Sequence, residues 1–441
     1  MSIIRQGFES ADLDVPVVLP TLNLDFANSQ SLDKRITFSR GSIGTRVNRN
    51  GLIETIAANQ PRFDFDPISG ECRGLLIEES RSNYFWGTQT GGGTGTVSDG
   101  TAIGADGVTA KKFVPTLGSA AFPGLSNYTQ YAIPVGSQVV GGTVDISFSG
   151  YFAATGTGLY IPDIVIAINA SGSNYIYAEL LPDLTNGNIV SKSLSGAAGL
   201  SELIAPQITL MPFGMYKVTW SVRYTQGATI RNTVDFGIQC RRKNSPSGAT
   251  GTYYADGVNG FQYSCIQYEI GAFPTSYIPT TASTVTRSAD NADMTGRNFS
   301  SWYNQSEGTV FCSFKTDGIS GNPRTFQLTG NNQNERLDHR IVGNTNGSEY
   351  YTGGINFGRI DDSGVTNPSQ GKIIVSQNSR SRQFCMNGRT VKSATIPNAP
   401  AVNTLNIGNY NLQATYLNGT IEKLAYYPKA LNDAEIQYLT Q

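Results

Sequence analysis

The chain has 441 residues, of which 15% are charged and 10% aromatic, and it contains 49 glycines. A single hydrophobic core stops growing at roughly 250 to 300 residues, so this length predicts about three domains. The 32 basic and 33 acidic side chains are scattered and leave a net charge of -1, which argues against nucleic-acid binding. No stretch approaches the roughly 18 apolar residues of a membrane span, and MSIIRQGFESADLDV lacks an apolar signal-peptide core. We therefore expect folding in a cytoplasm and no membrane insertion.

The N-terminal residues 1–88 show few clear strands for their length, so we expect an irregular segment that folds against a neighbour or a partner chain. The run QTGGGTGTVSDG, from Gln89 to Gly100, follows it. This run is rich in glycine but lacks the lysine and helix of a phosphate-binding loop. It therefore predicts a flexible loop or linker.

Alternation of apolar and polar residues dominates the central part of the chain. From Met215 to Tyr224, aromatic and valine side chains occupy one parity and polar side chains the other, the period of a half-buried strand. The same pattern recurs at Val144–Phe148, Val234–Cys240, Phe261–Cys265 and Val310–Phe314. Such short strands, punctuated by turn residues, predict antiparallel sheets.

Turn and linker signals complete the pattern. Asn-Gly pairs at 186–187, 387–388 and 418–419 predict type I′ turns, and the Thr/Ser-rich residues 276–293 predict a second extended linker. Near the end, Asn432 and Glu435 form the capping box of one short helix. We expect an all-β protein of tandem antiparallel β-sandwiches with an irregular N-terminal segment, divided into residues 1–88, 89–280 and 281–441.

Few side chains suit catalysis. His339 is the only histidine, and no G-x-S-x-G motif is present. The carboxylates of the adjacent pairs Glu78-Glu79 and Asp361-Asp362 would point to opposite faces of a strand, and in a loop such pairs are usually solvated. The five cysteines have long, irregular spacings, and Cys240, Cys265 and Cys312 fall in phase with apolar strand positions, which favours small buried side chains over a disulfide framework or a zinc site. We therefore predict no enzyme and no cofactor. A calcium ion stays open and unassigned, with four aspartates of the required oxygen-ligand type: Asp317, Asp338, Asp361 and Asp362.

A sugar site needs aromatic rings for the apolar face of a pyranose and planar polar groups for its hydroxyls. The segment 331–361 combines the two kinds, and its candidate carbohydrate-binding residues are Arg336, Asp338, His339, Tyr350, Tyr351 and Asn356. The alternative is an ordinary strand with Tyr350 on one face and Tyr351 on the other, one buried and one exposed.

Three stretches resemble known families. Leu24 to Asn83, with PRFDFDP and GLLIEESRSN, is similar to a module of phage tail, fibre and head-decoration proteins. Gln267 to Thr281, QYEIGAFPTSYIPTT, looks like the exit of a phage-associated jelly roll that resembles carbohydrate-binding modules. Residues 307–441, with FCMNGR and the run GTIEKLAYYPKALNDAEI, resemble the concanavalin A-like or laminin-G-like sandwich.

These resemblances imply a bacteriophage virion protein of the fibre, decoration or adhesin type. They imply attachment to other virion proteins through the N-terminal segment, a homo-oligomer, with a trimer favoured, and a host surface glycan as a candidate ligand. Two alternatives stay open: a capsid or tail cement protein that binds no glycan, and a polysaccharide depolymerase. Fold alone does not decide among them.

Overall fold

The computed structural model describes residues 18–86, 90–91, 95–117, 124–170, 174–195, 199–243, 255–319, 321–343, 345–362, 370–410 and 415–441. The chain forms two compact units: unit 1 comprises residues 1–37, 291–316 and 321–441, and unit 2 comprises residues 38–290 and 317–320. Both units consist of antiparallel sheets, so the all-β prediction is confirmed. The predicted borders at residues 88 and 280 do not coincide with those of the units, because residues 38–83 group with the central part of the chain.

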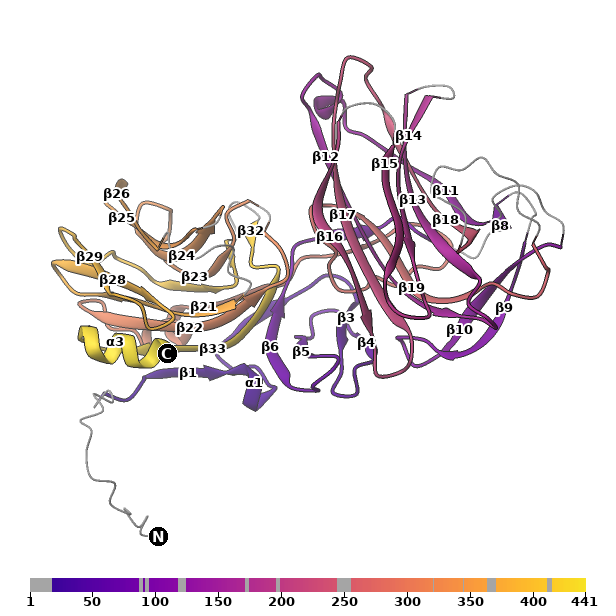
Figure 1. Ribbon diagram of the computed structural model, residues 1–441. Coiled ribbons are helices and arrows are strands. Elements are labelled where there is room, and N and C mark those ends of the chain that lie inside the picture. Colours follow the sequence, from indigo (N-terminus) through magenta and orange to yellow (C-terminus); the bar gives the residue numbers. More distant parts are fainter. Residues whose placement is uncertain are drawn as a thin grey trace, which may run out of the picture. The chain divides into compact units, whose positions relative to one another are not determined.

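Unit 2 is a sandwich of two six-stranded sheets (Figure 1). The strands of the first sheet, which we call the groove sheet, run in the order β16 (Leu200–Leu210), β17 (Tyr216–Thr225), β12 (Thr143–Ala154), β19 (Phe261–Ile270), β10 (Thr109–Pro115) and β9 (Gly95–Ile103). The strands of the second sheet run in the order β15 (Ile189–Ser195), β14 (Asn174–Pro182), β13 (Tyr160–Ala170), β18 (Thr233–Arg242), β11 (Gly124–Ala132) and β8 (Thr90–Gly91). A 3-10 turn, η1 (Val135–Ser137), follows β11.

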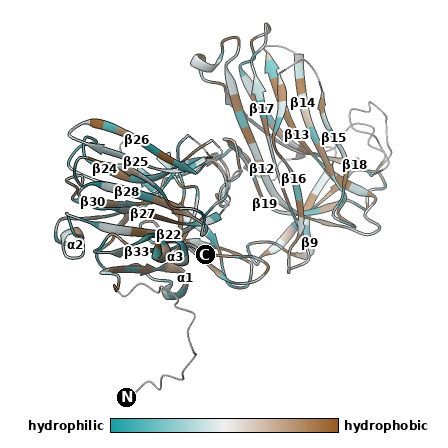
Figure 2. Ribbon diagram, turned by 60° about the vertical axis from the view of Figure 1, so that its left-hand side comes forward, coloured by the Kyte–Doolittle hydropathy of each residue, from teal (hydrophilic) through white to brown (hydrophobic). Residues whose placement is uncertain are grey.

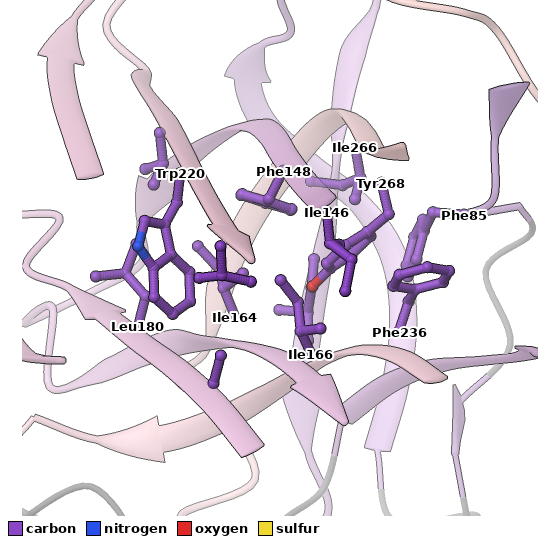
Figure 3. Close-up of a cluster of buried hydrophobic side chains, with 14 of the residues drawn as sticks. Phe85, Ile146, Phe148, Ile164, Ile166, Leu180, Trp220, Phe236, Ile266 and Tyr268 are labelled. Carbon is purple, nitrogen blue, oxygen red and sulfur yellow. The ribbon is translucent and has the colours of Figure 1, made fainter. Parts of the chain in front are cut away.

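The core of unit 2 lies between these sheets. Figure 3 shows Trp220 and Phe148 of the groove sheet against Leu180 and Ile164 of the second sheet, and all four are fully buried. In β17 the buried side chains Val218, Trp220, Val222 and Tyr224 share one parity, so the predicted half-buried strand is confirmed. Figure 2 shows the same alternation of polar and apolar residues along the strands.

Short strands of unit 2 lie outside the two large sheets. They are β3 (Gly44–Val47), β4 (Ile53–Ile56), β5 (Phe63–Phe65), β6 (Cys72–Ile77), β7 (Arg81–Asn83) and β20 (Val285–Arg287), while β2 (Thr37–Ser39) spans the sequence border between the units. β3 pairs with β4, β5 with β6, and β7 with β20. The N-terminal segment predicted to be irregular therefore contributes ordered strands.

The flexible loop predicted at residues 89–100 is wrong where the structure describes it, whereas residues 276–284 of the second segment contain no helix or strand, as predicted. Gly95 and Gly100 belong to β9, where a Cβ atom would lie 2.4 Å from the Phe113 ring and 2.2 Å from Gln262 Oε1, respectively. These glycines allow close approach in a sheet, so they do not mark flexibility. The second segment is anchored by Asn83, whose Nδ2 donates to the Ile278 carbonyl at 3.0 Å, and by its buried Arg287.

Cys265 departs from the predicted alternation. The register between β12 and β19 shifts between the pairs Ser149–Gln267 and Tyr151–Ser264, which marks a β-bulge, and Cys265 adopts a left-handed φ of 49°. The bulge turns Cys265 out of the main core, so it packs with Tyr151 and Met211, while Ile266 enters the main core. None of the five cysteines, all of which lie in described parts of the chain, forms a disulfide.

Unit 1 is a second sandwich. One sheet has the order β29 (Lys392–Thr395), β28 (Ser381–Met386), β27 (Gln370–Gln377), β22 (Gly308–Thr316) and β33 (Gly419–Tyr427), with β1 (Leu22–Asp25) paired to β33. The other has the order β21 (Asn291–Thr295), β30 (Thr404–Ile407), β23 (Arg324–Thr329), β24 (Arg336–Val342), β25 (Thr345–Thr352) and β26 (Ile355–Asp362). The small ribbon β31 (Asn409–Tyr410) and β32 (Thr415–Tyr416) and the short helices α1 (Phe26–Ser29) and α2 (Gly296–Ser300) complete the unit.

The predicted C-terminal helix is α3 (Asp433–Thr440). Asn432 accepts from the Glu435 amide at 2.9 Å, and the Glu435 carboxylate accepts from the Asn432 amide at 2.9 Å, so the predicted capping box is confirmed. Ile436 packs against Phe311 of β22 and Tyr427 of β33, on the outer side of the sheet that contains these two strands. Among the described residues no helix is long and apolar enough to cross a membrane.

Candidate functional site

The outer face of the β21–β26 sheet of unit 1 is polar across its whole width, and we call it the polar face. Strand register aligns its side chains in two rows that run across six strands. The first row is Asp293, Asn406, Gln327, Asp338, Glu349 and Arg359. The second row is Thr295, Thr404, Thr329, Arg336, Tyr351 and Asn356.

A chain of ion pairs with alternating charge connects the side chains in the middle of the polar face. Asp338 Oδ2 lies 3.0 Å from Arg324 Nε and 3.1 Å from Arg336 Nε. Glu349 accepts from Arg336 at 2.5 Å and from Arg340 at 2.6 Å. Because Asp338 and Glu349 are almost completely buried, these contacts offset the cost of removing two carboxylates from water.

Four of the six predicted sugar-binding residues lie on the polar face: Arg336, Asp338, Tyr351 and Asn356. The Arg336 guanidinium lies 4.0 Å from the centroid of the Tyr351 ring, and Asn356 Nδ2 donates to the Tyr351 hydroxyl at 2.8 Å. Tyr351 and Asn356 remain accessible, whereas Asp338 is fully buried. The accessible part of the predicted group is therefore the Tyr351–Asn356 edge.

The other two predicted residues, His339 and Tyr350, do not join this group. Both are fully buried on the core side of the sheet, because their positions in β24 and β25 have the opposite parity to Asp338 and Tyr351. Thr325 Oγ1 lies 2.9 Å from His339 Nδ1, and the Tyr350 hydroxyl donates to the Asn398 carbonyl. The two tyrosines lie on opposite faces of an ordinary strand, as the alternative had it, with Tyr350 buried and Tyr351 half-buried.

The four aspartates considered for calcium are not gathered. Asp317 belongs to unit 2, and the other three are each paired with an arginine: Asp338 with Arg324, Asp361 with Arg359 at 2.6 Å, and Asp362 with Arg389 at 3.5 Å. Among the described residues no group of three or more His, Cys, Asp or Glu side chains is placed to hold a metal ion.

Unit 2 contains a cavity that the sequence did not reveal, on the outer face of the groove sheet. Its volume is about 450 Å³, within the range of small-molecule sites, and we call it the Lys217 cavity. Ser149, Thr219 and Thr209 contribute small side chains to its floor, and the larger Tyr151 and Lys217 stand beside them. Residues 64–68 and 274–277 contribute further wall. The cavity exists because small polar side chains replace bulky ones on a covered sheet face.

The walls of the Lys217 cavity carry both charge signs. Asp64 is almost completely buried, and its Oδ1 accepts from the Val47 amide at 2.7 Å. Burial raises the pKa of Asp64 to about 6. Burial lowers the pKa of Lys217, although the charges of Asp317 and Asp64 act in the opposite direction.

A second cavity of about 460 Å³ adjoins the first, and Cys265 and Tyr277 line both. We call it the Tyr263 cavity after one of its lining residues, whose hydroxyl is buried without a hydrogen-bond partner among the described residues. The β-bulge at Cys265 lies at the junction. Such bulges and left-handed non-glycine residues are found more often next to functional sites than elsewhere.

One signal for these cavities was present in the sequence. In β17 the residues of the second parity, including Lys217 and Thr219, are the ones expected to face solvent. Strand parity identifies the residues on the outer face of the groove sheet, but not the segments that pack over that face. That cover comes from residues 44–78 and 274–277, which are distant in sequence and carry no periodic pattern.

Comparisons with known proteins find solved structures at low similarity only. No family model matches the sequence, and no curated protein matches it. The CBM40 module of a Ruminococcus gnavus IT-sialidase is 17% identical, and the match covers 33% of this chain and 88% of the module with a TM-score of 0.29. Domain 4 of AbnA, a GH43 extracellular arabinanase from Geobacillus stearothermophilus, is 14% identical over 35% of this chain and 73% of its own, with a TM-score of 0.29.

A third structure, the mouse laminin alpha1 chain domains LG4-5, is 10% identical over 72% of this chain and 94% of its own, with a TM-score of 0.20. Scores of this size carry no argument about function.

Proposed function

We propose that this protein is a non-enzymatic, carbohydrate-binding structural protein, and that the Lys217 cavity of unit 2 is its main glycan site. One observation carries the proposal: a cavity of ligand size joins an aromatic ring, Tyr151, to hydrogen-bonding side chains on one sheet face. Sugars present both an apolar ring face and hydroxyl groups, so a site for them needs both kinds of wall. The adjoining Tyr263 cavity supplies room for a further sugar unit.

Glycan binding to the purified full-length chain, measured by glycan array and by calorimetry, tests this proposal. The variant Thr219→Trp places a large side chain in the floor of the cavity and is expected to reduce affinity at least ten-fold. Ser201→Trp is the matched control, because Ser201 lies on the same sheet, is exposed and does not line the cavity. Equal affinities of wild type and Thr219→Trp, with unchanged melting temperatures, would remove the Lys217 cavity from the proposal.

The polar face of unit 1 is a second proposed glycan contact. Its accessible edge consists of Tyr351 and Asn356, two of the residue types that recognise sugars. Tyr351→Ala should weaken binding there without affecting a ligand in unit 2. The residues Asp338, Arg336 and Glu349 would position Tyr351 through the ion pairs of the polar face.

We further propose that the chain is a bacteriophage virion component of the fibre, decoration or adhesin type. The similarity of Leu24 to Asn83 to a phage structural module supports this assignment. A homo-oligomer, most simply a trimer, would add weak sugar contacts into avidity. Immunogold labelling of phage particles tests the location, and light scattering tests the oligomer. Release of reducing sugar from host polysaccharide would instead indicate a depolymerase.

A further inference from the structure

Lys217 is the cationic side chain in the floor of the Lys217 cavity. It lies beside Tyr151 in the sheet register, and its Nζ is 6.0 Å from the centroid of the Tyr151 ring. No described residue forms a hydrogen bond or ion pair with its ammonium group. An ammonium donates three hydrogen bonds and accepts none, so this group is ready to donate to a ligand.

The other cations near the cavity are already paired. Arg46 lies 2.5 Å from Glu54, and Arg73 lies 2.6 Å from Asp66. The lining carboxylate of Glu78 is held by Arg62 at 2.9 Å. These pairs satisfy one another within the wall, so Lys217 and Asp64 are the charged groups through which the cavity can select a ligand.

Asp64 supplies the complementary hydrogen-bonding character. Apart from the bond from Val47 to Oδ1, no hydrogen bond joins Asp64 to a described residue. Burial raises its pKa to about 6, so at pH 7.5 it is mainly ionised and can only accept. The cavity thus offers the Lys217 ammonium, which only donates hydrogen bonds, and the Asp64 carboxylate, which only accepts them. These two groups do not form an ion pair with each other.

Neighbouring hydroxyl groups match this combination. Each hydroxyl can donate one hydrogen bond and accept two, so one can accept from Lys217 while the next donates to Asp64. A carboxylated sugar would instead bring its negative charge beside the Asp64 carboxylate, with the single Lys217 ammonium to compensate the two charges. Like charges in a partly desolvated site cost more than they do in water.

We propose, on the basis of the glycan function above, that the Lys217 cavity selects an uncharged sugar residue with vicinal hydroxyl groups. In this arrangement Lys217 and Asp64 bind adjacent hydroxyls, and the Tyr151 ring bounds the sugar on one side. Lys217 and Asp64 are then the residues that determine specificity.

Calorimetry at pH 7.5 tests the selection, with the full-length chain and two ligand sets of equal length: neutral hexose oligomers and hexuronic acid oligomers. We expect wild type to bind at least one neutral oligomer at least ten-fold more tightly than any acidic one. Lys217→Met and Asp64→Asn, which keep side-chain size, should each lower affinity for the neutral oligomer about ten-fold. The control Lys112→Met removes a half-buried lysine that lines neither cavity and should change nothing.

The outcomes separate the two proposals. Preferential binding of the acidic oligomers would overturn the inference and leave glycan binding standing. Unchanged neutral affinity in both cavity variants would also overturn it. No binding of either set by wild type would overturn the glycan function together with the inference. The comparison of the two sets uses wild type alone, so it holds even where a variant fails to fold.

Discussion

His339 shows how one side chain takes its properties from its position in the sandwich. Its ring centroid lies 5.5 Å from that of Phe314 and 5.7 Å from that of Phe384, and its side chain is completely shielded from solvent. Burial, and secondarily the charge of Arg359, lowers the pKa of His339 to about 3. The side chain therefore stays neutral in the folded protein at pH values where an unfolded chain would protonate it.

This shift predicts a pH dependence of stability in unit 1. The unfolded chain binds a proton at His339 below about pH 6.5, whereas the folded chain does so only near pH 3. The stabilising effect is complete above pH 6.5 and is lost as pH falls toward 3. Between pH 7 and pH 5 the loss should be about 2 kcal/mol.

Chemical denaturation at both pH values, in wild type and in His339→Gln, measures this effect. Glutamine does not titrate, so the difference in unfolding free energy between the two proteins should narrow at pH 5. Groups that titrate elsewhere, such as the buried Asp64 of unit 2, cancel in that difference. Parallel profiles of the two proteins would contradict the assignment.

Strand parity could predict which of the candidate sugar-binding residues share a face of the sheet, but not which other residues lie beside them. It separates Asp338 and Tyr351 from His339 and Tyr350 once the strands are known, but the residue types alone suggested one group of six. Glu349 was missed although it lies in the same segment, because its place beside Asp338 depends on the register of β24 with β25. Register is set by long-range packing and the turn, which sequence periodicity does not contain.

At the scale of elements, the three Asn-Gly pairs share a sequence but not a conformation. Asn387 and Gly388 have φ values of 50° and 67°, the two positive angles of a type I′ turn, so this prediction is confirmed. At 186–187 only the glycine has a positive φ. At 418–419 only the asparagine does, and Gly419 instead admits the Lys315 carbonyl, which would lie 2.0 Å from a Cβ atom.

The Asn387 turn gives a test of this distinction. Asn387→Ala forces a Cβ-bearing residue without a local polar group into the left-handed region and removes the bond from the Lys372 amide to Asn387 Oδ1, which is 2.9 Å long. We expect a loss of about 1 to 2 kcal/mol in unfolding free energy. Asn387→Gly, which suits the left-handed region, should lose less. A larger loss in the glycine variant would show that backbone strain is not the dominant cause.

At the scale of the whole chain, the sequence indicated the strands better than it indicated the divisions between them. Low-complexity glycine and threonine runs resembled linkers, yet β9 and the segment before β21 are packed. The reason is that a small side chain can serve either flexibility or close approach, and only its neighbours decide. The two units likewise draw on segments far apart in sequence, which local patterns cannot connect.

A buried cluster of charges explains why residues 38–83 group with unit 2. Arg40 binds Asp290 at 3.1 Å, Arg62 binds both Asp290 and Glu78, and Arg287 lies 3.4 Å from Glu78. Burial alone would raise the pKa of Glu78, but the charges of Arg287 and Arg62 and hydrogen bonds from Ser276 lower it to about 2. Arg40, Arg62 and Glu78 all lie in the stretch that resembles a phage module, so that motif has a structural role here.

Asp290 is the group on which this cluster depends most. Its oxygens contact Arg40 and Arg62 and accept from the Glu78 amide at 3.0 Å, and it is fully buried. Asp290→Asn keeps the shape but removes the negative charge, which leaves arginines buried without full compensation. Removing one partner of a buried ion pair costs about 3 to 5 kcal/mol. We expect a loss of this size in unit 2, measured by calorimetric unfolding of the full-length chain.

The matched control is Asp99→Asn, which removes a carboxylate from an exposed pair with Lys111, also in unit 2. Exposed pairs contribute little, so the melting temperature should barely change. If residues 38–83 were an attachment arm that is independent of unit 2, Asp290→Asn would leave the unit 2 transition in place as well. A selective fall of that transition in Asp290→Asn would instead mean that residues 38–83 are part of the unit that carries the Lys217 cavity. Truncation could then not separate the proposed attachment role from the proposed glycan site.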